Sequence, residues 1–188
     1  MKELEWKTLE KNGVLHTRVF DVNAKKCESA DGTKGKFYTI DASDWVVVVP
    51  VIGDDFVVVK QWRHGSGCVT CEFPGGIIEK GEDPLDAARR ETEEETAYRA
   101  GKLTKLGEMN PNPALYTNRL HIYLAEDLTP VGEQHLDDDE FINYFVKPID
   151  EVIRDFASGE YQHAYTGTAL ALYMRERLLK NDRKGEKA

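Results

Sequence analysis

The chain lacks several features that define other classes of protein. No apolar stretch approaches the roughly 20 residues that a membrane-spanning helix needs, and the segment Met1–Trp6 has no apolar signal region. We therefore expect no membrane partner and a cytoplasmic location. Positive charge is also scarce, since 25 Lys and Arg residues stand against 34 Asp and Glu residues. The net charge of −9 argues against nucleic acid as a partner, because a phosphate backbone attracts basic surfaces.

Cysteine is nearly as scarce, with only Cys27, Cys68 and Cys71. An odd number of cysteines argues against a disulfide framework. Cys68 and Cys71 have the spacing of redox and zinc sites, but no second pair and no histidine cluster accompanies them. We interpret them as free thiols on a strand.

The most informative stretch, residues 75–98, joins a glycine-rich turn to the start of a helix. Asp83 can cap this helix, and Pro84 suits its first position. Carboxylates then crowd the second half, where the helix dipole disfavours negative charge. The repulsion among them indicates that a positive group lies beside them. The residues concerned are Glu91, Glu93, Glu94 and Glu95.

Three of these carboxylates share one helical face. Glu91, Glu94 and Glu95 are spaced i, i+3 and i+4, so their oxygens converge as a hard cation such as Mg²⁺ requires. The carbonyl of Gly75, on the turn packed against the helix, could complete the ligands. The alternative is an acidic face that is simply solvated.

The full pattern resembles the Nudix box, the signature of the Nudix hydrolases. It consists of Gly76, five residues, Glu82, seven residues, Arg90–Glu91, two residues and Glu94–Glu95. The resemblance implies a divalent metal, Mg²⁺ with Mn²⁺ as the alternative, and a supporting pair between Glu82 and Arg90. It implies four metal ligands, which are the Gly75 carbonyl, Glu91, Glu94 and Glu95.

Two positions depart from the box. Thr92 stands where an aliphatic residue is usual, and Ala97 where glycine is usual. Neither residue is a ligand, so we expect these departures to affect packing and the end of the helix.

Residues 1–41 contain short strand patterns separated by turn signals. A segment of this size cannot close a core alone, so we expect a small antiparallel β-sheet that leans on the main domain or on a second copy of the chain. The expected strands are Trp6–Leu9, Leu15–Val22 and Phe37–Ile40, with turns at Asn12–Gly13 and Asp31–Gly32.

Residues 42–188 form the second expected domain. The continuous apolar run Asp44–Val51 is typical of a strand covered on both faces. Further strands are interleaved with one central helix and with helices near the C-terminus, which predicts an α/β (α+β) fold with a mixed sheet between helical layers. This agrees with the α/β/α sandwich that the Nudix box implies.

Segments outside the box resemble the ADP-ribose and nucleotide-sugar pyrophosphatase branch of the family. They include Val59–Arg63, Glu72–Gly76 and Pro113. The resemblance implies a homodimer that exchanges its N-terminal sheets. It also implies an aromatic residue of that sheet stacked on the nucleobase. Trp6 is the best match for that residue, with Phe37 or Tyr38 as the weaker candidate.

The same resemblance places Arg63 near the diphosphate or the dimer seam, and Glu72 at that seam. Plain salt bridges between strands are the alternative for both residues, and Trp6 has the alternative of an aromatic at a rim or in a core. Residues 112–119 replace a glycine-containing loop that is common in ADP-ribose enzymes. A nucleoside diphosphate hexose is therefore as credible a substrate as ADP-ribose.

The expected reaction is hydrolysis of the diphosphate in such a substrate, giving a nucleoside monophosphate and a sugar phosphate. By resemblance the general base is Glu140, in a mobile acidic loop, with Glu133 as the second candidate; the alternative is that these acids only keep a loop solvated. The catalytic set is then Glu140, Glu95, Arg90 and Glu82. Two other classes stay open, which are a non-catalytic Nudix-fold nucleotide sensor and an acidic helix that binds a basic protein.

Overall fold

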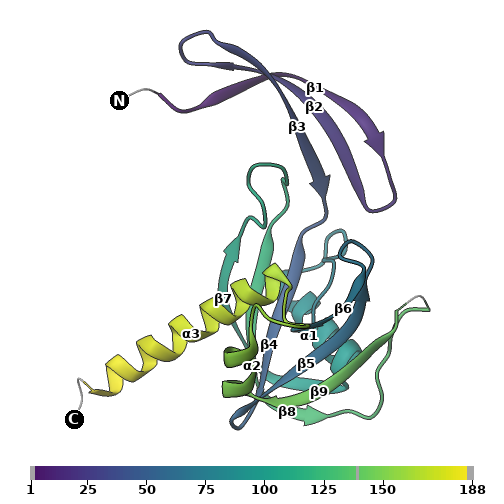
Figure 1. Cartoon of the computed structure of the whole chain (residues 1–188), viewed down its shortest axis with the longest axis vertical. Coiled ribbons are helices and arrows are strands. Elements are labelled where there is room, and N and C mark those ends of the chain that lie inside the picture. The colour runs from purple at the N-terminus through teal and green to yellow at the C-terminus, as the bar shows by residue number, and fades with distance from the viewer. Residues whose placement is uncertain (1–2, 139, 186–188) are drawn as a thin grey trace. The chain divides into compact units, whose positions relative to one another are not determined.

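The computed structural model describes residues 3–138 and 140–185, with side chains as far as Lys180 (Figure 1). The chain divides into two compact units. One comprises Met1–Asp44 and Asn110–Arg119, and the other comprises Trp45–Met109 and Leu120–Ala188. The expected domains include residues 1–2 and 186–188, and the expected acidic loop includes Asp139. Those residues lie outside the described ones.

The first unit is built on an antiparallel sheet in the order β1-β2-β3. The predicted turn at Asp31–Gly32 is confirmed, since Gly32 has a φ of 82° and its N–H donates to the Ser29 carbonyl at 2.9 Å. The predicted turn at Asn12–Gly13 is wrong, because both residues pair with β2 inside one continuous strand. A register shift just after Gly13 absorbs the irregularity. The strands are β1 (Trp6–His16), β2 (Phe20–Ser29) and β3 (Lys34–Ala42).

Residues 110–119 complete this unit, although they lie far along the chain. The Ile40 N–H donates to the Leu115 carbonyl at 2.8 Å, and the Thr117 N–H donates to the Ile40 carbonyl at 3.1 Å. The loop therefore extends the edge of β3. The sequence prediction did not include this segment in the N-terminal part.

The second unit has a mixed sheet, as predicted (Figure 1). Strand β4 runs parallel to β8, which pairs antiparallel with β7, and β5 pairs antiparallel with β6 and β9. Strands β4 and β5 pair only at Val51–Phe56 and Ile52–Asp55 and then separate. The elements are β4 (Trp45–Ile52), β5 (Asp55–Arg63), β6 (Cys68–Glu72), α1 (Pro84–Thr96), β7 (Tyr98–Met109), β8 (Leu120–Pro130), β9 (Ile142–Pro148), α2 (Ile149–Asp155) and α3 (Ala164–Gly185).

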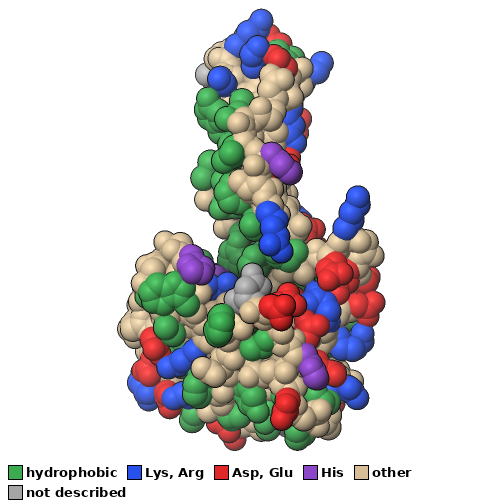
Figure 2. Space-filling model, turned by 90° about the vertical axis from the view of Figure 1, so that its right-hand side faces the viewer, with side chains coloured by type: hydrophobic (Ala, Val, Ile, Leu, Met, Phe, Trp, Pro, Cys, Tyr) green, Lys and Arg blue, Asp and Glu red, His purple; other side chains and the backbone are tan. Residues whose placement is uncertain are grey.

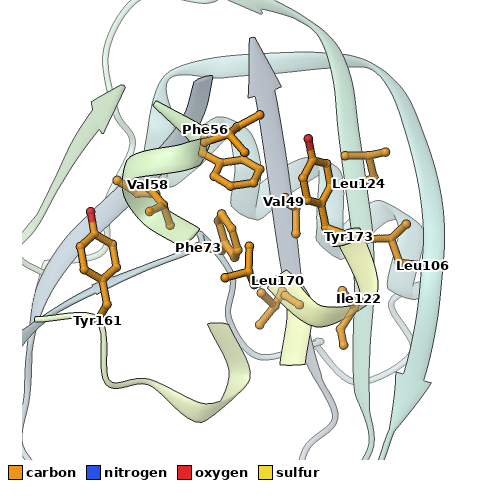
Figure 3. Packing of buried hydrophobic residues seen from close by; sticks show 14 of the residues in the cluster. Val49, Phe56, Val58, Phe73, Leu106, Ile122, Leu124, Tyr161, Leu170 and Tyr173 are labelled. Carbon is orange, nitrogen blue, oxygen red and sulfur yellow. The ribbon is translucent and has the colours of Figure 1, made fainter. Parts of the chain in front are cut away.

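Strand β4 is covered on both faces, which explains its continuous run of valines. Val47 and Val49 belong to a cluster with side chains from β5, α2 and α3, including Phe56 and Tyr173 (Figure 3). The alternate residues of the strand, Val46 and Val48, belong to a second cluster that includes Ala87 and Ala88 of α1. Successive side chains of a strand point to opposite faces, so one short segment supports both layers.

The cysteines are free thiols in the structure, as predicted. Cys68 and Cys71 lie three residues apart on β6, so their side chains leave opposite faces of the strand. Cys71 is buried in the cluster beside α2 and α3. No helix in the described part of the chain is both long and apolar enough to cross a membrane.

Candidate active site

Helix α1 begins and ends as its sequence indicates. The Leu85 N–H donates to the Asp83 side chain at 2.8 Å, and Pro84 occupies the first turn. The helix ends at Ala97, whose φ of 56° lies in the left-handed region and whose N–H donates to the Glu93 carbonyl at 3.0 Å. Glycine adopts that conformation at the least cost, which explains why glycine is expected at this position. Thr92 is fully buried, and its hydroxyl donates to the Ala88 carbonyl at 2.6 Å.

The turn before the helix lies directly against β4. The Val48 N–H donates to the Pro74 carbonyl and the Val46 N–H to the Gly76 carbonyl, both at 2.9 Å. The carbonyl between them, that of Gly75, points away from β4 because carbonyls alternate along an extended chain. A Cβ on Gly75 would lie 2.9 Å from the Val47 Cα, so no side chain fits.

Arg90 is the positive group that the crowded carboxylates require. Its Nε and Nη2 donate to the Glu82 carboxylate at 2.9 and 3.0 Å. Its Nη1 donates to Glu91 at 2.8 Å and to Glu94 at 3.0 Å, and its Nη2 reaches the Ile77 carbonyl at 3.2 Å. The hydrogen bonds that Arg90 donates to Glu82, followed by the charge of Glu91, raise the pKa of Arg90. The side chain thus joins the turn to the helix.

Glu91 and Glu95 are buried carboxylates on the inner side of α1, with 7% and 3% of their surface exposed. Burial raises the pKa of Glu91 to about 7, although the charge of Arg90 opposes it. Burial, and then the charge of Glu91, raise the pKa of Glu95 well above its usual value. The Gly75 N–H donates to Glu95 Oε2 at 2.9 Å. A Cβ on Gly76 would lie 2.7 Å from Glu91 Cδ, so glycine at that position leaves space for the carboxylate.

These residues fit a hard divalent cation by their chemistry. In the part of the chain that the structure describes, no three Asp, Glu, His or Cys side chains already gather tightly enough to hold one ion. Arg90 instead bridges Glu91 and Glu94. The donors are all oxygens, and the two buried carboxylates have pKa values raised by burial, which a cation beside them would lower.

A pocket of about 330 Å³ opens between the turn, α1 and β5. The pocket is lined by Arg90 and by five other residues that the sequence analysis assigned to the site. These five are Arg63, Gly75, Glu91, Glu95 and Glu140. Sequence reasoning missed Gln61, which it could have found because Gln61 lies two residues before Arg63 and so shares its face of the strand. The other lining residues are Trp45, Gly76, Ile77, Glu79 and Asp137, brought together by tertiary folding.

The remaining candidates lie elsewhere. Glu82 and Glu94 line a neighbouring hollow together with Arg89, Arg90 and His135. Glu133 does not line the pocket. Trp6 belongs to the first unit, where its ring meets that of Phe37 edge to face with centroids 5.2 Å apart.

Arg63 is held at the pocket wall by Glu72, the buried last residue of the neighbouring strand β6. The Arg63 Nε and Nη2 each donate to a Glu72 oxygen at 2.8 Å. The Thr70 hydroxyl also donates to Glu72, and the His163 Nδ1 lies 3.1 Å from its Oε2. Burial by itself would raise the pKa of Glu72, but the hydrogen bonds and charge of Arg63 outweigh burial and lower it.

The acidic loop after β8 docks on the C-terminal end of α1. The His135 N–H donates to the Glu94 carbonyl at 3.0 Å, and the Gln134 side-chain amide donates to the Glu95 carbonyl. Further along, the exposed Glu140 accepts a hydrogen bond from the Asp137 N–H at 3.3 Å. The hydrogen bonds of Gln134 and His135 anchor the loop to the helix that carries Glu91 and Glu95. Glu140, farther along the loop, is one of the residues that line the pocket.

The comparisons with known proteins agree with this geometry. The model of the NUDIX domain family matches residues 43–166. An ADP-ribose pyrophosphatase of Bacillus subtilis (strain 168) is 33% identical over 181 residues, which are 95% of this chain and 98% of that protein. A methanol dehydrogenase activator of Bacillus methanolicus is 29% identical over 155 residues, 81% of this chain and 84% of that protein.

The fold has a counterpart among solved structures. The crystal structure of an ADP compounds hydrolase superposes with a TM-score of 0.82 over 97% of this chain and 99% of that one. Its sequence identity of 24% supports similarity of fold alone.

Proposed function

Because the chain belongs to the Nudix family, we propose that it hydrolyses the diphosphate linkage of ADP-sugar type substrates. The substrate is ADP-ribose or a nucleoside diphosphate hexose, and the products are a nucleoside monophosphate and a sugar phosphate. The observation that carries this proposal is the pocket in which the buried Glu91 and Glu95 face Arg63. The Bacillus subtilis relative, named an ADP-ribose pyrophosphatase, supports the substrate class.

The buried carboxylates Glu91 and Glu95, with Glu94 and the Gly75 carbonyl, are the groups that would hold Mg²⁺ or Mn²⁺. Such an ion, when bound, neutralises charge on the diphosphate and lowers the pKa of a coordinated water. The carboxylates have to be ionised for this role, and their raised pKa values mean that they bind the cation in competition with protons.

Arg63 is the side chain best placed to contact the diphosphate. In the described lining of the pocket the cationic side chains are Arg63 and Arg90. Arg90 is already engaged by three carboxylates, whereas among the described residues the ion pair of Arg63 is with Glu72, on one side of its guanidinium. The rest of its planar fork can donate to phosphate oxygens, which suits bidentate recognition.

Glu140 is the proposed general base. It is exposed at the edge of the pocket, so it can accept a proton from water and pass it to solvent. The water oxygen then forms a bond to one phosphorus, and the bond from that phosphorus to the bridging oxygen breaks. The second phosphate departs with the electron pair, so both products are monoesters.

The full chain incubated with ADP-ribose and a panel of nucleoside diphosphate sugars, with and without Mg²⁺ or Mn²⁺, tests the proposal. Ion-exchange chromatography should resolve a nucleoside monophosphate and a sugar phosphate in equal amounts, formed only with metal. Glu95→Gln should lower kcat by orders of magnitude with the fold retained. The matched control is Glu93→Gln on the same helix, whose side chain pairs with Arg99 outside the pocket. Equal activity of the two variants would contradict the proposal.

The second candidate is a nucleotide sensor that binds its ligand without cleaving it. The observation in favour of this candidate is that one relative, the methanol dehydrogenase activator of Bacillus methanolicus, is named for activating another enzyme. The intact set Glu91, Glu94 and Glu95 favours catalysis, because a sensor has no need of them. Binding of ADP-ribose by calorimetry, with no product after prolonged incubation with metal, would favour the sensor.

We also propose a homodimer that exchanges its N-terminal sheets. The support is the single-layered sheet of the first unit, along which hydrophobic side chains are exposed (Figure 2). One chain has a mass of 21.3 kDa, and analytical ultracentrifugation should give twice that value. Trp6→Ala tests the proposed stacking on the nucleobase and should raise KM. The exposed residues are Trp6, Leu9, Leu15, Phe20, Phe37 and Tyr38.

A further inference from the structure

Behind the pocket wall, the Glu72 carboxylate is almost completely enclosed, with 2% of its surface exposed. Arg63 on β5 donates two hydrogen bonds to it at 2.8 Å each. Thr70 on β6 donates a third. The fourth neighbour comes from a distant part of the chain, since the Nδ1 of His163 lies 3.1 Å from Glu72 Oε2.

The chemistry of this contact determines which nitrogen of His163 carries the proton. The pKa of Glu72 is lowered, so the carboxylate is ionised near neutral pH and can only accept hydrogen bonds. Burial lowers the pKa of His163, so its ring is neutral there and carries a single N–H. That N–H is at Nδ1, because Glu72 offers no proton to it.

His163 is itself fixed by the start of α3. It directly precedes that helix, and its carbonyl accepts a hydrogen bond from the Gly167 N–H at 3.1 Å. Thr166, in the first turn, accepts one from the Phe73 N–H at 3.4 Å. The Tyr165 ring packs edge to face on the imidazole, with centroids 5.0 Å apart. The first turn of α3 is thus tied to the end of β6 beside Glu72.

We propose that His163 is a positioning residue for the hydrolysis, acting through Glu72 on Arg63. This rests on the proposed function. His163 holds the carboxylate in the orientation that presents two parallel acceptors to the Arg63 fork. With Nε and one N–H of Nη2 occupied, the remaining N–H groups of Arg63 are directed to the pocket that it lines. Without His163, Glu72 can rotate and Arg63 loses its fixed direction.

Kinetics of the full chain with metal and ADP-ribose test this role. His163→Leu should raise KM about tenfold with kcat within about twofold, because Arg63 contacts the diphosphate in both the bound and the transition state. His163→Asn places an amide N–H near the Nδ1 position and should restore most of the affinity. His163→Gln carries its amide one bond farther out and should not. The control is His64→Leu, a change at an exposed histidine directly after Arg63.

A double-mutant cycle separates positioning from general packing. If His163 acts through Arg63, adding His163→Leu to Arg63→Leu should leave KM unchanged within about twofold. A residue that only supports the fold would add its full tenfold loss in both backgrounds. That second result, or a His163→Leu enzyme with normal KM, would overturn the proposal.

A measurement without substrate keeps this inference distinct from the proposed function. The ¹⁵N signal of the Arg63 Nε–H should be resolved and slow to exchange in the unaltered protein and in His163→Asn, and broadened in His163→Leu. If that pattern appears in a protein that cleaves no nucleotide sugar, the positioning of Arg63 by His163 through Glu72 is supported and the proposed reaction is contradicted. If cleavage is normal and the Arg63 Nε–H signal is the same in His163→Leu as in the unaltered protein, the positioning role of His163 is contradicted and the proposed reaction is not.

Discussion

Glu72→Gln is the sharpest test of how this site is held together. The change keeps the shape of the side chain but removes the charge and turns one accepting oxygen into an NH₂ donor. That donor then faces the N–H groups of Arg63 and the hydroxyl of Thr70, which donate to Glu72 in the native protein, and the Nδ1 of His163, which lies 3.1 Å from Glu72 Oε2. Arg63 also loses its buried counter-charge.

The structure sets the size of the expected effect. Removing one partner of a buried ion pair costs about 3–5 kcal/mol. The Arg63 side chain keeps 27% of its surface exposed, so water relieves part of its charge, and the lower end applies. A loss of about 3 kcal/mol in a chain of this size lowers Tm by roughly 6–12 °C at pH 7.

The pH dependence of this effect has a definite sign. The pKa of Glu72 in the folded state is below its ordinary value of 4.5, so its ion pair stabilises the fold above the unfolded pKa. That stability is lost as the pH falls through the folded pKa. The difference in Tm between the native protein and Glu72→Gln should therefore be full at pH 7 and should narrow below about pH 4.5.

Differential scanning calorimetry across this pH range measures the effect. The control is Glu160→Gln, because Glu160 pairs with Lys60 in a largely exposed position and should contribute under about 1 kcal/mol. A double variant, Arg63→Met with Glu72→Met, should be more stable than Glu72→Gln, since it leaves no unpaired charge. The reasoning is refuted if Glu72→Gln has the same Tm as the native protein at pH 7. It is also refuted if the difference in Tm between the two proteins grows as the pH is lowered.

Three further changes test other parts of the site. Gly75→Ala should destabilise the fold by about 2–3 kcal/mol and lower activity, because the added methyl group overlaps the backbone of β4; thermal melts and kcat/KM check both. Thr92→Val should change stability by less than about 1 kcal/mol, since the buried hydroxyl donates to the Ala88 carbonyl of its own helix; a loss above 2 kcal/mol in urea would contradict this. Glu140→Gln should leave Tm unchanged because the side chain is exposed, yet lower kcat by about 10²–10⁴-fold if it is the base.

Local rules made the central helix predictable. Asp83 and Pro84 define its start because capping and a fixed φ depend on neighbouring residues alone. The positions of Glu91, Glu94 and Glu95 on one helical face follow from helical periodicity. The same kind of rule identified β4, since an unbroken apolar run requires cover on both faces.

Local rules failed where pairing between strands decided the outcome. Asn12–Gly13 has the composition of a turn, but in β1 both residues pair with β2, and a register shift accommodates the glycine. Residues 110–119 lie far from the N-terminal strands in the sequence, and only hydrogen bonds to Ile40 assign them to the first unit. Neither result can be read from a window of neighbouring residues.

The sequence by itself determined the central helix, the spacing of its carboxylates and the family, because these depend on residues within one segment. Only the tertiary structure decided that Arg90 bridges Glu91 and Glu94, and that His163 reaches Glu72 behind Arg63. The physical reason is that a buried charge takes its partners from whatever elements pack around it. Those elements come from distant parts of the chain, and their side chains meet only after the sheet and helices are assembled.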